Sequence, residues 1–166
     1  MMKILSSAHV HTTFCDGKTT AADMARTAYD MGFVSLGFTL HAAQTFDPAH
    51  CIDPSSEEDY KKEIRRLQQE YKGRMAIYLG IERDMLSCSD IKDYDYFIAS
   101  VHYFTRHDGS HSGVDAPSGE MQKYVNECCG GDGLKMAKQY FTLFCDHVVR
   151  LSPNPDKEMW ERIGLK

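Results

Sequence analysis

Four short apolar runs alternate with helical patterns along most of this chain, and this alternation limits the folds open to it. The runs cover residues 1–5, 34–40, 75–81 and 96–101, and each is short and rich in apolar side chains. Runs of this length that contain β-branched or aromatic residues are typical of buried strands. Because helical patterns separate most of them, the strands are expected to run parallel. The sequence therefore predicts an α/β fold.

A residue that can bind a metal ion follows each of these runs. Parallel strands place their carboxyl ends on one side of a sheet, where α/β barrels build their active sites. The first two candidates are two residues apart, so on an extended chain their side chains point the same way. The pattern predicts that all the candidates gather at one rim of the sheet; they are His9, His11, His41, Glu82 and His102.

Four short motifs, taken in their order and spacing, resemble those of the PHP (polymerase and histidinol phosphatase) superfamily. The motifs are His9-Val10-His11-Thr12, Gly37-Phe38-Thr39-Leu40-His41, Gly80-Ile81-Glu82-Arg83-Asp84 and Ala99-Ser100-Val101-His102. The pair Phe14-Cys15 and the stretch at residues 100–103 look most like the histidinol-phosphatase branch. The resemblance covers residues 3 to about 153. It implies a distorted β/α barrel that binds up to three divalent metal ions, commonly zinc, iron or manganese, and hydrolyses phosphate esters.

The resemblance also implies a role for each candidate ligand. His9 and His11 would bind the first metal, and Glu82 would bridge that metal and another. His102 would bind the metal that shares Glu82, and His41 would serve the remaining one. Glu82 and His102 are the catalytic residues that the resemblance implies.

Three features depart from the family pattern. Leu40 stands where the second motif usually carries an acidic residue. Asp16 stands where many members have a histidine, and it could bind a metal in that place because carboxylate oxygen suits hard or borderline cations. The later Gly-His and Asp-x-His motifs do not occur after Leu151, and Asp146-His147 lies inside a helical pattern. The sequence thus resembles the front half or more of a catalytic domain.

The length of the chain limits how far a barrel can close. Its 166 residues are ample for one domain, expected over residues 1–166, but a complete α/β barrel takes roughly 250 residues. Four parallel strands cannot close, so we expect an incomplete PHP-type β/α barrel that lacks the C-terminal strands. Its sheet would have open edges, which invite pairing with another chain. A compact half-barrel, a homo-oligomer that pairs edges, and a fragment of a longer or disrupted gene all remain open.

Composition and net charge limit the classes of molecule that this chain is expected to bind. Hydrophobic residues make up 42% and charged residues 26%, as in an ordinary globular protein, and the net charge of −5 disfavours binding to nucleic acid. The basic cluster at residues 61–66 has acidic neighbours and is interpreted as an ion-paired helix face. No apolar stretch reaches the ~18 residues that span a bilayer, and no signal-peptide pattern is present. We expect a cytoplasmic protein with no membrane partner and a small phosphorylated substrate.

The remaining patterns predict helices and one long loop. A helix is expected from Thr20 to Met31, and a second from Ser55 with a Ser55–Glu58 capping box. Residues 104–119 are rich in His, Asp, Gly and Ser and predict a loop, followed by a short helix at 121–129. A further helix over 134–150 is expected to bury an apolar stripe consisting of Met136, Tyr140, Phe141, Phe144 and Val148, with Cys145 also in the core.

Three functions remain open on this evidence. The first is an active metal-dependent phosphoesterase, with L-histidinol phosphate as the substrate that the resemblance implies. The second is a truncated, catalytically impaired relative, and the third is a non-enzymatic assembly module that uses the open sheet edge. The residue types favour the first, because clustered dications neutralise a phosphate dianion and acidify water, and neutral imidazoles bind such cations without adding charge.

Overall fold

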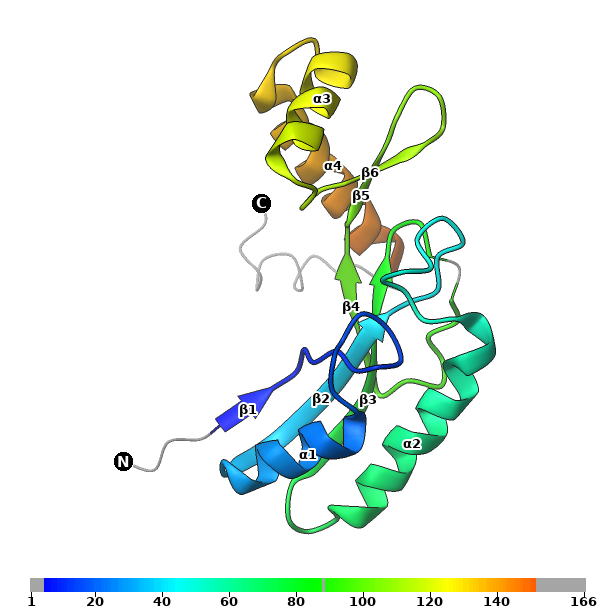
Figure 1. The fold of residues 1–166 in the computed structure, drawn as a ribbon, viewed down its shortest axis with the longest axis vertical. Coiled ribbons are helices and arrows are strands. Elements are labelled where there is room, and N and C mark those ends of the chain that lie inside the picture. Colours follow the sequence, from blue (N-terminus) through cyan, green and yellow to red (C-terminus); the bar gives the residue numbers. More distant parts are fainter. Residues whose placement is uncertain (1–4, 88, 152–166) are drawn as a thin grey trace. The chain divides into compact units, whose positions relative to one another are not determined.

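The computed structural model describes residues 5–87 and 89–151 of the chain (Figure 1). The chain forms two compact units, Met1–Ile98 and Ala99–Lys166. Whether they make up one domain, as the sequence suggests, stays a prediction. Within the residues that the structure describes, none of the helices has the length and apolar character needed to span a membrane.

A sheet with the strand order β1-β2-β3-β4 forms the framework of the site. β1 and β2 are parallel, as are β2 and β3, and helices alternate with the strands. The fold is the expected incomplete α/β barrel, although residues 1–4 of the first predicted strand lie outside the described residues. In chain order the elements are β1 (Leu5–Ser7), α1 (Ala21–Asp30), β2 (Phe33–His41), the 3-10 helix η1 (Pro54–Ser56), α2 (Glu57–Glu70), β3 (Ala76–Asp84) and β4 (Tyr96–Ser100).

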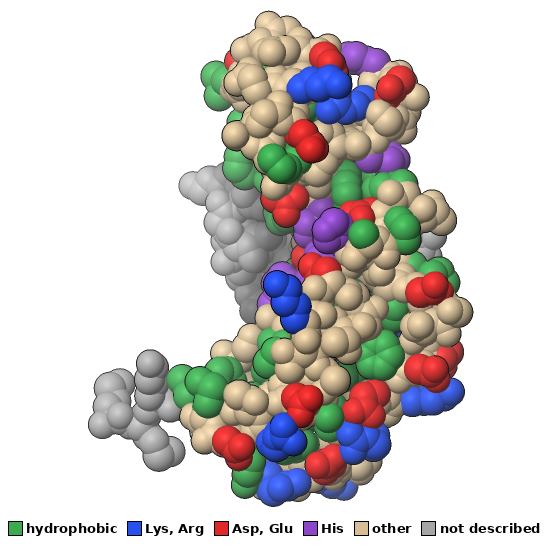
Figure 2. Space-filling model, viewed as in Figure 1, with side chains coloured by type: hydrophobic (Ala, Val, Ile, Leu, Met, Phe, Trp, Pro, Cys, Tyr) green, Lys and Arg blue, Asp and Glu red, His purple; other side chains and the backbone are tan. Residues whose placement is uncertain are grey.

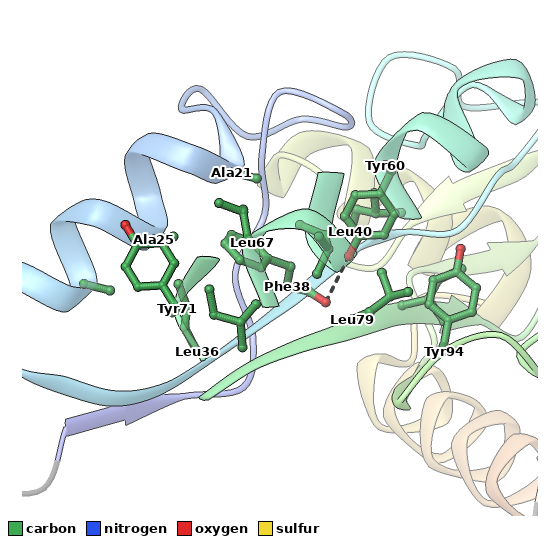
Figure 3. Close-up of a cluster of buried hydrophobic side chains, with 14 of the residues drawn as sticks. Ala21, Ala25, Leu36, Phe38, Leu40, Tyr60, Leu67, Tyr71, Leu79 and Tyr94 are labelled. Carbon is green, nitrogen blue, oxygen red and sulfur yellow. Dashed lines mark hydrogen bonds between the residues drawn. The ribbon is translucent and has the colours of Figure 1, made fainter. Parts of the chain in front are cut away.

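Side-chain alternation along β2 and β3 separates the core of the first unit from the site. One set of alternating side chains packs against α1 and α2 and is almost fully buried. The other set lies on the opposite face and includes His41 and Glu82. Leu40 is 1% exposed, so the residue at this departure from the family pattern belongs to the core. Figure 3 shows the packed side chains, among them Ala21, Ala25, Leu36, Phe38, Leu40, Tyr60, Leu67, Tyr71 and Leu79.

The ends of the helices follow local chemistry. Thr20 caps α1, because its hydroxyl accepts a hydrogen bond from the Asp23 amide at 3.1 Å. The predicted Ser55–Glu58 capping box is wrong. Asp53 accepts from the Ser55 amide at 2.8 Å and begins η1, and Ser56, which precedes α2, makes no side-chain capping bond. An Asp-Pro pair before the serines therefore changes how this helix begins.

The exposed face of α2 carries paired charges, as the sequence suggested. Arg66 binds Glu63 and Glu70 at 2.8 and 2.6 Å, and Lys61 lies 3.1 Å from both Glu57 and Glu58. Figure 2 shows acidic and basic side chains interspersed over the part of the first unit where α1 and α2 lie. The basic cluster is thus neutralised locally.

The second unit replaces the predicted loop with a hairpin. β5 (Tyr103–Thr105) and β6 (His111–Gly113) pair antiparallel, and α3 (Ser118–Cys129) begins three residues before the helix predicted at 121–129. The turn holds Asp108 and Gly109, where Gly109 has φ of 83° and Asp108 accepts from the Ser110 amide at 2.9 Å. Asp-Gly is a recognised hairpin signal, and the polar composition of the segment obscured it.

The last helix, α4 (Gly133–Leu151), buries a different stripe from the one predicted. Phe141 is 64% exposed, Phe144 is 36% exposed and Cys145 is also exposed, so these three predictions of burial are wrong. The side chains nearer the core are spaced by about one helical turn, and the phenylalanines lie off that line. The side chains that pack on Phe104, Tyr124 and Cys129 are Met136, Tyr140 and Leu143.

Candidate metal centre

The pairing of β2 with β3 brings two predicted ligands side by side. His41 lies opposite Glu82 in the parallel register. The Ala42 amide donates to the Glu82 carbonyl at 2.9 Å, which continues the pairing past the end of β2. Glu82 is only 4% exposed, and a buried carboxylate needs partners.

The segment after β1 supplies those partners. Thr39 donates its amide to the Val10 carbonyl at 2.9 Å, which holds this segment along β2. His9 and His11 flank Val10, and their Nε2 atoms lie 3.0 and 3.1 Å from Oε2 of Glu82. The His41 Nδ1 atom lies 3.4 Å from the same oxygen. Three imidazole nitrogens from two separate segments therefore converge on one carboxylate oxygen.

A tight turn at residues 12–15 brings Asp16 close to His11 and His41. The Cys15 amide donates to the Thr12 carbonyl at 3.0 Å, which closes the turn. Asp16 then lies 2.8 Å from His11 Nδ1 through Oδ1, and 3.8 Å from His41 Nε2 through Oδ2. The structure thus brings Asp16 to the predicted cluster.

Protonation of His11 offsets part of the negative charge of this cluster. Hydrogen bonds to Cys15 and to the carboxylates of Glu82 and Asp16 raise the pKa of His11 to about 11, against the opposing effect of burial. Burial acts to raise the pKa of Asp16, but hydrogen bonds from His11 and Cys15 outweigh it and lower that pKa. The protonated imidazole places a positive charge beside two carboxylates, and a bound divalent cation could supply that charge instead.

Within the first unit, two overlapping groups of donor atoms could hold a metal ion. They are His9, His11 and Glu82, and then His11, Asp16 and His41, and the donor atoms of each lie within 4.8 Å of one another. Imidazole nitrogen and carboxylate oxygen are the donors that zinc, iron and manganese accept. The residues therefore fit a divalent cation, and His11 is common to both groups.

His102 and Tyr96 lie outside these groups. His102 follows β4 and belongs to the second unit, so its place in the centre stays a prediction. Sequence reasoning gave no role to Tyr96, whose hydroxyl donates to the Ala8 carbonyl at 2.6 Å. Gly37 and Gly80 lie beneath its ring. Glycine at these two positions is the sequence feature that accommodates the ring.

Imidazoles and carboxylates gathered at the strand ends of an α/β sheet define a candidate divalent-metal centre. A family model described as the PHP domain matches residues 7–141. The chain belongs to the PHP domain family.

Two curated relatives are named as histidinol phosphatases. The histidinol-phosphatase of Bacillus subtilis is 29% identical over 162 residues, covering 85% of this chain and 59% of its own length. A "probable histidinol-phosphatase" of Deinococcus radiodurans is 33% identical over 110 residues, covering 60% of this chain and 42% of its own length. The chain thus spans about half the length of the relatives that it matches.

A solved structure supports the fold. The crystal structure of a Listeria monocytogenes protein, assigned as the histidinol phosphatase hisK, matches with a TM-score of 0.58 at 17% identity. The match covers 70% of this chain and 51% of that one. At this identity the likeness shows a shared fold and no more.

Proposed function

We propose that this chain is a metal-dependent phosphoesterase of the PHP type, and that it hydrolyses a phosphate monoester such as L-histidinol phosphate. The observation that carries the proposal is the convergence of His9, His11 and His41 on one oxygen of Glu82. These are motif residues in a chain that belongs to the PHP family. The names of the two curated relatives support this choice of substrate.

The proposal gives each residue of the cluster a task. His9, His11 and Glu82 would hold one divalent cation, and Asp16 and His41 would serve a second. Bound divalent cations supply neutralisation of the phosphate charge and a more acidic water. Glu82 is buried beside both groups, so its carboxylate fixes the spacing of the donors. His102 is proposed to complete the set from the second unit.

Neutral imidazoles suit this task because they leave the centre cationic. The two groups together contain only two carboxylates, Asp16 and Glu82. A centre with few anionic ligands keeps a net positive charge when loaded with dications, and that charge favours a phosphate dianion. The donor set therefore suits a phosphate ester better than a neutral substrate.

Phosphate release from L-histidinol phosphate tests the proposal. The purified chain is assayed with added manganese, zinc or iron, beside His9→Ala and the matched control His50→Ala. His50 is an exposed histidine that pairs with Asp47 at 2.8 Å, so its loss leaves the cluster intact. We expect turnover that requires metal, is lost in His9→Ala and is kept in His50→Ala.

The other outcomes separate the alternatives. Metal binding without phosphate release above the His9→Ala level contradicts the catalytic proposal and favours an impaired relative that keeps the centre. If the chain shows no metal binding and no turnover, that result contradicts the metal centre itself. A stable oligomer without metal would then favour an assembly module.

A further inference from the structure

The face of the sheet that carries the candidate ligands also carries a tyrosine ring laid across two strands. Tyr96 begins β4 and belongs to the first unit. A Cβ atom at Gly80 in β3 would lie 2.5 Å from Cζ of Tyr96, and one at Gly37 in β2 would collide with its hydroxyl group. Glycine at both positions therefore leaves the space that the ring occupies.

The hydroxyl at the far end of this ring anchors the segment that holds the first two histidines. The Tyr96 hydroxyl donates to the carbonyl of Ala8 at 2.6 Å. Ala8 directly precedes His9, and its Cα would lie 3.2 Å from a Cβ at Gly37, so this part of the segment rests on β2. The Val10 carbonyl accepts from the Thr39 amide at 2.9 Å. The main chain is thus held on both sides of His9, at Ala8 by the Tyr96 side chain and at Val10 by the Thr39 amide.

The Tyr96 hydroxyl remains a hydrogen-bond donor at neutral pH. Burial, together with the charge of Asp95, raises the pKa of Tyr96 to about 12, so the hydroxyl keeps its proton at neutral pH. Tyr78 meets the Tyr96 ring edge to face, with ring centres 6.5 Å apart, and supports it from the same strand face. The contact with Tyr78 therefore helps to hold the Tyr96 ring in the orientation that brings its hydroxyl to Ala8.

We propose that Tyr96 is a positioning residue for the metal centre: its hydroxyl holds the Ala8 carbonyl and so keeps His9 and His11 at donor distance from Glu82. Gly37 and Gly80 serve the same end by admitting the ring. This inference rests on the proposed function, because it assumes that the histidines bind a cation. Partners that hydrogen-bond directly to a metal ligand typically change metal affinity by about 10–100-fold, and for an anchor one residue away from His9 we expect an effect at the lower end of that range.

Tyr96→Phe tests the role because it keeps the ring and removes only the hydroxyl. Tyr78→Phe is the matched control, since its ring lies beside the same face and is 47% exposed. Zinc affinity is measured by competition with a chromogenic chelator, and the cobalt-substituted centre is followed by its visible absorption. We expect zinc affinity to fall about tenfold in Tyr96→Phe with a changed cobalt spectrum, and both to be unchanged in Tyr78→Phe.

A metal-free measurement separates this inference from the proposed function. The imidazole nitrogen signals of His9 and His11 are recorded by NMR in the metal-free chain and in both variants. We expect the signals to shift in Tyr96→Phe alone. Unshifted signals, or zinc affinity equal to that of the parent chain, overturn the positioning role. Failure of the parent chain to bind metal overturns the proposed function instead, and the NMR signals then still decide the role of Tyr96.

A second variant guards against a purely structural effect. Gly80→Ala keeps the tyrosine hydroxyl but places a methyl group against the ring. If both changes act through one contact, the loss in zinc affinity from the double variant is smaller than the sum of the single losses. Additive losses contradict a shared mechanism.

Discussion

A single oxygen of Glu82 lies within 3.4 Å of nitrogens from His9, His11 and His41. The carboxylate is buried, so its charge must be balanced either by protonated imidazoles or by a bound cation. This one oxygen therefore contacts side chains from the segment after β1 and from the end of β2. The loss of its charge is the most local test of the centre.

Glu82→Gln keeps the size of the side chain and removes the charge. Because the residue is a proposed ligand, we expect zinc affinity to fall by more than the ~10–100-fold that loss of an outer partner costs. A chelator competition titration measures this fall, with Glu58→Gln as the control on an exposed glutamate of α2. Equal affinities in the two variants would contradict the role of Glu82 as a ligand.

Tyr60 is a buried residue with a structural role behind the same strands. It is fully buried, and its hydroxyl lies 2.8 Å from the Gly80 carbonyl and 3.1 Å from the Phe38 carbonyl. Tyr60→Phe should lower the free energy of unfolding by about 1–2 kcal/mol, because a buried hydrogen bond is lost. Urea unfolding checks this against Tyr29→Phe, at a position 39% exposed. A loss no larger than that of the control would show that the hydroxyl contributes nothing.

At the scale of elements, Asp95 joins α2 to the sheet. Its carboxylate accepts from the Leu79 amide at 2.8 Å, from Gln68 at 2.7 Å and from Arg65 at 2.7 Å. Burial acts to raise the pKa of Asp95, and these hydrogen bonds outweigh it and hold that pKa below its usual 3.8. One side chain thus ties a helix to the start of β4.

The low pKa of Asp95 makes the stability of this junction depend on pH. Its ionised form favours the folded chain, so its contribution is present above pH 3.8 and is lost as the pH falls through the folded-state pKa. Asp95→Asn should cost about 1–2 kcal/mol of unfolding free energy at pH 7. The difference from the parent chain should shrink in acid. Urea unfolding across a pH series that shows a constant difference would contradict this.

The elements that sequence could predict are those whose pattern is set by burial. The apolar runs at 34–40 and 75–81 predicted β2 and β3, and the structure buries alternate residues of β2 such as Leu36, Phe38 and Leu40. The beginning of α2 was wrong because Asp53 competes with Ser55 as a local cap. The face of α4 was wrong because periodicity finds apolar side chains but does not show which of them meet α3 and the hairpin.

At the scale of the whole molecule, parallel strands explain why the candidate centre was predictable. His41 and Glu82 end neighbouring strands, so their proximity follows from topology alone. Asp16 was harder, since its approach depends on the turn that follows Thr12. Tyr96 was missed because nothing local in the sequence tells which side chain fills the space above Gly37 and Gly80.

The open edge of the sheet leads to a prediction about association. Among the described residues β1 has a strand neighbour on one side only, and it is three residues long. A short edge offers few hydrogen bonds to another chain, so we expect weak association that depends on concentration. Light scattering after size-exclusion chromatography measures the mass over a wide concentration range, and Ser6→Pro should reduce any dimer. A tight oligomer unaffected by Ser6→Pro would contradict pairing through this edge.

Counting bound metal tests the central claim most directly. The purified chain is dialysed to equilibrium against zinc, and the bound zinc is counted by mass spectrometry in the parent chain, in His11→Ala and in His50→Ala. His11 belongs to both donor groups, so the account predicts that the parent chain and His50→Ala retain zinc and that His11→Ala loses it. Retention of the same amount of zinc by His11→Ala would contradict the metal centre at these strand ends.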